Sequence, residues 1–113
     1  MIGHALYTDG SRKDRRTGAG FVAFYNRSKL GQYCERLDDN AMVFQAEAIA
    51  LARAADFVSS NEGLYAGRHV TIYSASRLVL EALSSARLHS RVVKFAAESL
   101  NKAGKVASSL QPC

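Results

Sequence analysis

The sequence of 113 residues predicts a single mixed α/β (α+β) domain spanning residues 1–113, and three observations support this. Short apolar segments alternate with turn signals over the first third of the chain. Segments rich in Ala and Leu with helical spacing fill much of the remainder. A β-branched segment lies between two of these helical segments. A chain of this length buries about two-thirds of its unfolded surface, so it needs no metal or disulfide to form one core.

Three strands are predicted first. Residues 5–8 are apolar and end at the turn signal Asp9-Gly10-Ser11. The segment 21–25 follows a basic loop, and a weaker strand covers about 29–37. Because short connections join antiparallel neighbours, these segments predict a meander.

The remaining elements alternate between helix and strand. A long helix is predicted over about 42–58, with N-cap candidates at 38–40. A fourth strand at 70–73 leads into a helix over about 76–83. Ser90 is the cap candidate for a third predicted helix that closes at Gly104, and a fifth strand is predicted over about 106–110. The order β-β-β-α-β-α-α-β describes a mixed sheet carrying helices, with no visible domain boundary.

Composition excludes several classes of protein. The content of 48% hydrophobic and 22% charged residues argues against disorder and against a fibrous repeat. No apolar run approaches the roughly 20 residues of a membrane span, and the N-terminus lacks signal-peptide architecture. Cys34 and Cys113 lie far apart without the spacing of a metal site, which argues against both a disulfide framework and a zinc module. We therefore expect an intracellular protein, cytoplasmic or nuclear, without a membrane partner.

The charge distribution bears on the partner. Fifteen Lys and Arg residues against ten Asp and Glu residues give a net charge of +5. The basic residues gather at 12–16 and again in the C-terminal third of the chain. Two such clusters on a small domain favour a polyanion, because neutralising phosphates releases counterions. A merely solubilising surface is equally compatible with this pattern.

Glu47 carries the first chemical signal. At 100° per residue it lies in the middle of the apolar stripe of the long helix, among Val43, Phe44, Ala50, Leu51, Ala54 and Val58. An unpaired carboxylate in such a setting is costly. The alternatives are a salt bridge to an Arg, a rim position that reaches solvent, or a metal-binding or catalytic role.

Asp9 carries the second signal, at the end of the first predicted strand. Asp commonly forms turns there, because it hydrogen-bonds its own backbone. The first strand and the sheet-facing side of the long helix are also able to bring Asp9 and Glu47 together. Two like charges at close range need a divalent cation between them, and hard oxygen ligands suit Mg²⁺ or Mn²⁺.

Four blocks of sequence follow one another over nearly the whole chain: Tyr7-Thr8-Asp9-Gly10-Ser11, Gly18-Ala19-Gly20, Phe44-Gln45-Ala46-Glu47 and Ile72-Tyr73-Ser74-Ala75-Ser76. In order and spacing they resemble the type 1 ribonuclease H family. The third block most resembles domains attached to reverse transcriptases of non-LTR retrotransposons. The resemblance implies the ribonuclease H-like fold and metal-dependent endonucleolytic cleavage of the RNA strand of an RNA/DNA hybrid.

By this resemblance, Asp9 and Glu47 are the catalytic and metal-binding residues, two of four carboxylates that hold two Mg²⁺ ions. Positions that contact the nucleic acid match Gly10, Ser11, Gln45 and Ser76. Arg12, in the basic segment, would add a phosphate contact. Each also has a structural alternative: Ser11 as a turn residue, Gln45 on the solvent face and Ser76 as a helix cap.

The sequence departs from the family at two points. Ala75 stands where the family has its third carboxylate, and no Asp follows Asp56, so the fourth is missing. The chain also stops where the family's final helix would follow, which predicts a domain truncated at its C-terminus. Two-metal hydrolysis needs bridging carboxylates that hold the ions about 3.5 to 4 Å apart. We expect weak or single-ion binding and impaired or absent cleavage. The alternative is a non-enzymatic module that binds nucleic acid or packs against a reverse transcriptase.

Overall fold

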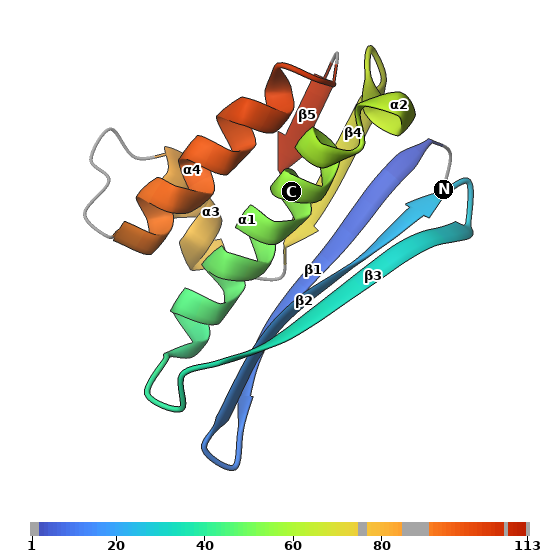
Figure 1. Cartoon of the computed structure of the whole chain (residues 1–113). Coiled ribbons are helices and arrows are strands. Elements are labelled where there is room, and N and C mark those ends of the chain that lie inside the picture. Colours follow the sequence, from blue (N-terminus) through green and yellow to red (C-terminus); the bar gives the residue numbers. More distant parts are fainter. Residues whose placement is uncertain (1–2, 75–76, 85–90, 108, 113) are drawn as a thin grey trace.

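The computed structural model describes residues 3–74, 77–84, 91–107 and 109–112. Five strands form one sheet in the order β3-β2-β1-β4-β5 (Figure 1). The strands β1 (His4–Lys13), β2 (Arg16–Tyr25) and β3 (Ser28–Leu37) form the antiparallel meander. The strand β4 (His69–Ser74) is parallel to β1, and β5 (Ser109–Pro112) is parallel to β4. This confirms the predicted mixed sheet and places β1 near its centre.

The helices are α1 (Val43–Ser60), α2 (Glu62–Tyr65), α3 (Arg77–Ser84) and α4 (Arg91–Gly104). Figure 1 shows α1 and α4 side by side over one face of the sheet. Buried alanines run along α1 and let it approach the strands closely. None of the helices described is long and apolar enough to cross a membrane.

The core lies between the sheet and α1. Leu6 of β1, Phe21 of β2 and Ile72 of β4 meet Leu51 and Val58 of α1 there. The side chains of β1 alternate, so that Leu6, Thr8 and Gly10 are buried toward the helices while Tyr7, Asp9 and Ser11 are exposed. We call this second side of β1, β2 and β3 the open face, because no helix of the described segments covers it.

Both connections in the meander are two-residue turns. Asp14 and Arg15 have φ of 52° and 65°, and Asn26 and Arg27 have φ of 47° and 75°. Two left-handed residues in succession match the twist of a hairpin. The expected basic loop at 12–16 is therefore wrong: β1 stays paired with β2 as far as Lys13 and Arg16.

Asp9 lies within β1, so its predicted position at the end of the first strand is wrong as well. The Asp9-Gly10-Ser11 signal does not make a turn, because each of the three residues pairs with a residue of β2. Gly10 instead serves the packing of β1 on α1.

Smaller differences concern element ends. Helix α1 starts after Met42, whose N–H donates to Gln45 Oε1 at 2.9 Å, so none of the predicted caps at 38–40 is used. The short helix α2 was not predicted. The fifth strand begins at Ser109 rather than near Val106, because the Val106 N–H donates to the Ala103 carbonyl and prolongs the turn after α4.

Candidate functional site

Strand β1 and helix α1 touch at Gly10 and Glu47. A Cβ atom added to Gly10 would lie 2.7 Å from the Cα of Glu47 and 2.5 Å from the carbonyl carbon of Ala46. Both values are shorter than ordinary van der Waals contact, so only glycine allows this approach. The backbone of Glu47 is therefore held against β1 one residue beyond Asp9.

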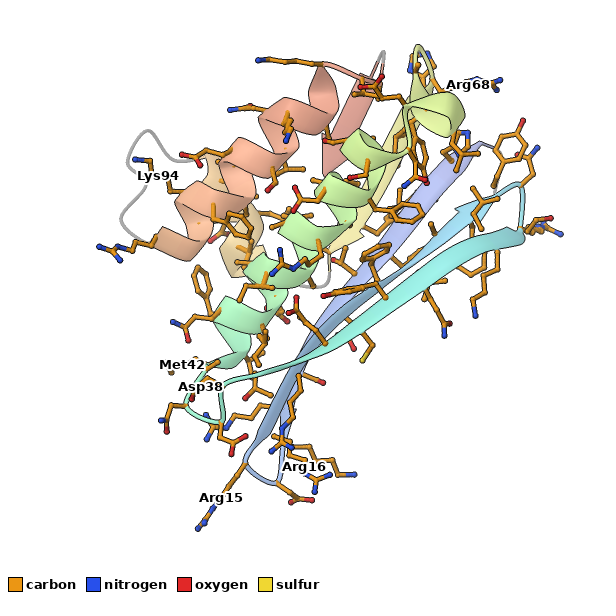
Figure 2. The ribbon with its side chains drawn as sticks, viewed as in Figure 1. Arg15, Arg16, Asp38, Met42, Arg68 and Lys94 are labelled. Atoms are coloured by element: carbon orange, nitrogen blue, oxygen red, sulfur yellow. The ribbon has the colours of Figure 1, made fainter. Side chains whose placement is uncertain are left out.

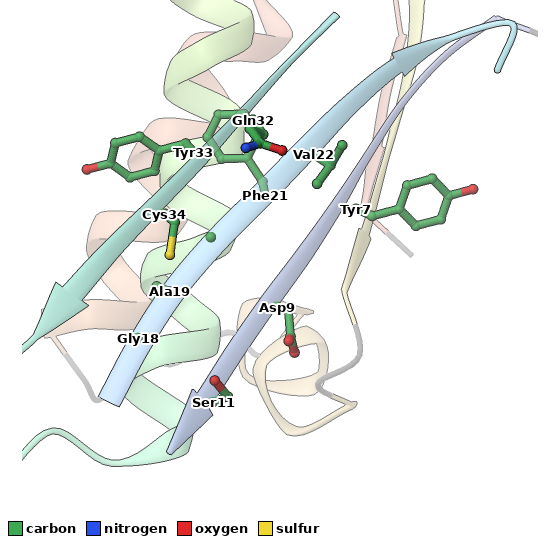
Figure 3. A pocket seen from close by; sticks show the side chains of 11 residues that line it. Tyr7, Asp9, Ser11, Gly18, Ala19, Phe21, Val22, Gln32, Tyr33 and Cys34 are labelled. Carbon is green, nitrogen blue, oxygen red and sulfur yellow. The ribbon is translucent and has the colours of Figure 1, made fainter. Parts of the chain in front are cut away.

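Asp9 lies one residue beyond the point where the pairing of β1 with β4 ends. The last residue pair between β1 and β4 joins Thr8 to Ser74, whereas β1 continues. Asp9 pairs with Gly20 on its other side, and Figure 3 shows its carboxylate directed away from β2. Asp9 thus follows the carboxyl end of β4 in space, beside the contact between β1 and α1.

Glu47 is half-buried, which corresponds to the rim position among the three alternatives for this carboxylate. Ion pairs in the described part of the chain join Arg36 to Asp39 and join Arg53 to Glu35 and to Asp56. Neither Asp9 nor Glu47 takes part in them. Both carboxylates are therefore without a neutralising cation among these residues, and both remain available to one.

A complete metal centre is not formed by the residues that the structure describes. They contain no group of three or more His, Cys, Asp or Glu side chains placed to hold an ion. Ala75 and Ser76, the predicted vacant ligand position and the predicted hybrid contact, lie outside the described residues. The donors present do not fit a two-ion site, because two carboxylates leave most of its coordination positions unfilled.

The other predicted nucleic-acid contacts lie near Asp9 and Glu47. Ser11 is exposed and projects from the same side of β1 as Asp9. Gln45 is exposed in the first turn of α1, two residues before Glu47, and its Oε1 atom caps the helix. Gly10 lies between Asp9 and Ser11 in β1 and contacts the backbone of Glu47.

Arg12 has a structural contact that the sequence did not reveal. Its Nη1 donates to the carbonyl oxygen of Ala41 at 3.2 Å, and Thr17 Oγ1 donates to the same oxygen at 2.9 Å. Arg12 therefore fastens the connection that leads into α1. Its contact with phosphate remains a prediction.

The open face also carries residues that were not proposed as site residues from the sequence. Among them, Tyr7, Val22, Gln32 and Cys34 line a hollow of about 420 Å³ (Figure 3). A second hollow of about 740 Å³ shares Ser11, Gly18 and Cys34 with it. The alternation of exposed and buried positions in β1 would have indicated this face, had the strand been extended to Lys13.

Comparison with known proteins identifies the fold. No protein-family model and no curated protein matches the chain. Among solved structures, it resembles RNase H1 from the halophilic archaeon Halobacterium salinarum (TM-score 0.74, 15% identity, 97% of this chain and 83% of that chain). It also resembles LC11-RNase H1 in complex with an RNA/DNA hybrid (TM-score 0.79, 16% identity, 97% and 83%). A third similar structure is the N-terminal RNase H domain of a Mycobacterium tuberculosis protein, fused to maltose-binding protein (TM-score 0.76, 14% identity, 98% and 85%). The chain therefore has the ribonuclease H fold.

Proposed function

We propose that this chain is a ribonuclease H-type domain that binds RNA/DNA hybrids and cleaves their RNA strand poorly or not at all. The observation that carries the proposal is the contact of Gly10 with the backbone of Glu47, because it holds Glu47 against β1 one residue from Asp9, where the pairing of β1 with β4 ends. The fold supports it, since LC11-RNase H1, which has this fold, was solved in complex with an RNA/DNA hybrid.

Impaired cleavage follows from the set of acids. Asp9 and Glu47 are the candidate ligands for Mg²⁺ or Mn²⁺, and Ala75 offers a methyl group where the resemblance implies a third carboxylate. The 113 residues supply no Asp after Asp56. Mg²⁺ demands near-octahedral coordination and keeps its waters readily. Two carboxylates therefore support one weakly held ion, and we assign no cleavage step to this polypeptide.

Hybrid binding uses other groups. Duplexes of A-like form are recognised through 2′-hydroxyls and phosphates across a wide, shallow minor groove. Ser11, Gln45 and the backbone of Gly10 are the proposed contacts here, with Ser76 as a fourth. We further propose a reverse transcriptase as the partner protein, on the resemblance of the Phe44–Glu47 block to retrotransposon domains.

Binding is tested by fluorescence anisotropy with a labelled RNA/DNA hybrid. Gln45→Glu keeps the oxygen that caps α1 but places a negative charge beside the phosphates, so affinity should fall severalfold. Asn101→Asp, on the exposed surface of α4, is the matched control and should change little. Affinity should also fall steeply between 50 and 200 mM salt, by about tenfold or more if several phosphates are contacted. An unaltered protein that shows no affinity for the hybrid would refute the proposed function.

Cleavage is tested separately. The unaltered chain should leave the hybrid intact in Mg²⁺ and in Mn²⁺, whereas Ala75→Asp should increase cleavage in Mn²⁺. Robust cleavage by the unaltered chain would show that a carboxylate at position 75 is not needed, and the proposal of impaired cleavage would then be wrong.

A non-enzymatic module is the second candidate, and Ala75 at the position where the resemblance implies a third carboxylate favours it. Metal titration separates the two. Ion binding that is lost in Asp9→Asn and Glu47→Gln indicates a domain of catalytic descent, whereas a chain that binds the hybrid but shows no measurable ion binding indicates a binding module.

A further inference from the structure

We infer that the open face of the sheet binds single-stranded nucleic acid, with bases on the stacked rings of Tyr7 and Tyr73 and phosphates on Lys13, Arg16 and Arg36. This surface goes beyond the proposed binding of hybrids, with which it shares Ser11.

The shape of this face is a trough across three strands. Pairing registers place Asp9 beside Gly20 and Cys34, and Ser11 beside Gly18 and Arg36. The two glycines carry no side chains, so the sheet is hollowed there. The hollows of about 420 and 740 Å³ adjoin, because they share Ser11, Gly18 and Cys34. A continuous path therefore leads from Tyr7 toward the β1–β2 turn.

Aromatic rings stand at one end of the trough. Tyr7 and Tyr73 stack with 4.8 Å between ring centroids and 10° between planes, and Phe24 packs edge-on against Tyr7. Tyr7 is 39% exposed and Tyr73 is 38% exposed, so part of each residue reaches solvent. Exposed rings of this kind stack with any nucleotide base that offers its face.

Basic side chains stand at the other end. Lys13 pairs with Arg16 across the hairpin, and alternation puts both on the side of Tyr7, together with Arg36 of β3. From Tyr7 to Lys13 the strand advances about 20 Å. This is enough for a few nucleotides of an extended strand. Figure 2 shows Arg15 and Arg16 at this turn, well away from Lys94 on α4.

The charges of the trough leave a positive excess at this end. Lys13 and Arg16 take part in none of the ion pairs found among the described residues, whereas Arg36 pairs with Asp39 at 3.0 Å. The carboxylates lining the hollows are Asp9, Asp14 and Glu35. Glu35 is bound by Arg53 Nε at 2.7 Å, and Asp9 and Asp14 are exposed, so salt screens their repulsion of phosphate.

These features favour a single strand over a duplex or a second copy of the chain. A duplex keeps its base faces inside its own stack, away from Tyr7 and Tyr73. A second copy that docked through this face would carry the same positive excess, so its Lys13 and Arg16 would repel those of the first copy. A single strand offers bases to the rings, and its phosphates release counterions on contact with the basic end.

The charge test compares two double variants by anisotropy with a labelled oligothymidylate over a range of salt. In Lys13→Gln/Arg16→Gln the slope of log affinity against log salt should shrink by about 1.4, since each lost phosphate contact removes about 0.7 for a single strand. Lys94→Gln/Lys102→Gln on α4 removes the same charge from exposed positions elsewhere and should leave the slope unchanged. Equal effects of the two double variants would overturn the assignment.

The stacking test uses Tyr73→Leu and Tyr73→Phe. Affinity for the single strand should fall about tenfold in the first and stay near the original value in the second, because a phenylalanine ring still stacks. Urea unfolding of both variants shows whether the fold survives. Ultraviolet crosslinking of the unaltered protein to an oligonucleotide containing 5-iodouracil should label the peptide of Tyr7 or Tyr73. Crosslinks found only elsewhere would contradict the inference.

Further outcomes separate this surface from the alternatives. Dimerisation in sedimentation that Tyr73→Leu abolishes, without binding of the single strand, would assign the face to a second copy. Gln45→Glu should weaken binding of the hybrid and spare that of the single strand. An unaltered protein that binds the single strand but not the hybrid would refute the proposed function. One that binds the hybrid but not the single strand would refute this inference.

Discussion

The imidazole of His4 and the phenol ring of Tyr65 pack edge to face, with 4.8 Å between their centroids, where β1 begins. Both residues are buried, and neither His4 Nδ1 nor Tyr65 Oη has a hydrogen-bond partner within the described parts of the chain. Buried polar atoms are normally bonded, because an unpaired one has lost its water. Because the His4 imidazole is ionisable, its burial here makes the stability of the domain depend on pH.

Stability should fall as the pH drops from 7.5 to 5.5. Burial, and to a smaller extent the charge of Arg68, lower the pKa of His4 from its ordinary value of 6.5. The unfolded chain therefore takes up a proton near pH 6.5 while the folded protein does not, so acid favours unfolding. Urea unfolding at each pH measures this. His4→Gln should flatten the dependence, whereas His69→Gln, at an exposed position, should preserve it. An unchanged profile in His4→Gln would contradict the prediction.

Tyr65→Phe should leave stability unchanged or raise it by up to about 1 kcal/mol, because the variant removes a buried hydroxyl without a partner and keeps the ring. Burial raises the pKa of Tyr65 to about 12. In the unaltered protein the phenol therefore ionises on unfolding between pH 10 and about 12, and stability should decline across that interval. Chemical unfolding at pH 7 and at pH 11 tests both points. A loss of more than about 1 kcal/mol at pH 7 would mean that the hydroxyl has a partner.

Gly10→Ala should destabilise the protein by about 3 kcal/mol or more, at or above the upper end of the usual range for overpacking, because the added methyl group meets the backbone of α1. Hybrid binding should weaken along with it, since β1 must move away from Glu47. Gly63→Ala is the control, because a Cβ atom at Gly63 meets nothing within 4 Å. Equal stability of the two variants would disprove the close contact of β1 with α1.

Thr17→Val should cost about 1 to 2 kcal/mol. The Thr17 hydroxyl is buried and donates to the Ala41 carbonyl, which the variant leaves with Arg12 as its remaining side-chain donor. The volume hardly changes, so the loss reports the hydrogen bond. Thermal unfolding of Thr17→Val beside Thr17→Ser measures it. Thr17→Ser keeps the hydroxyl, and it should retain more stability than the valine variant if the hydrogen bond dominates over the lost methyl group.

Much of the architecture followed from local pattern. The β-branched segment at 70–73, the periodic segment around 42–58 and the periodic segment between Ser90 and Gly104 became β4, α1 and α4 with only small shifts at their ends. Apolar periodicity reports which side of an element is buried, and that property survives in any tertiary arrangement. The four ordered sequence blocks pointed to the same fold that the solved structures share.

Local signals failed where two elements meet. The turn signal at Asp9-Gly10-Ser11 predicted a strand end, but β1 continues because β2 pairs with these residues and Gly10 must admit α1. The cap of α1 moved to Met42 for a related reason: Arg12 and Thr17 hold the Ala41 carbonyl and so set where the helix starts.

The order of residues alone determined the alternation of strands and helices and the candidate acids Asp9 and Glu47, and it put Ala75 where the family resemblance implies a carboxylate. Only the tertiary structure decided that β1 passes Asp9 and meets α1 at Glu47, and that Tyr7, Lys13 and Arg36 share one face. The physical reason is that these relationships depend on strand register and on the close approach of backbones, which arise from contacts between residues distant in the chain.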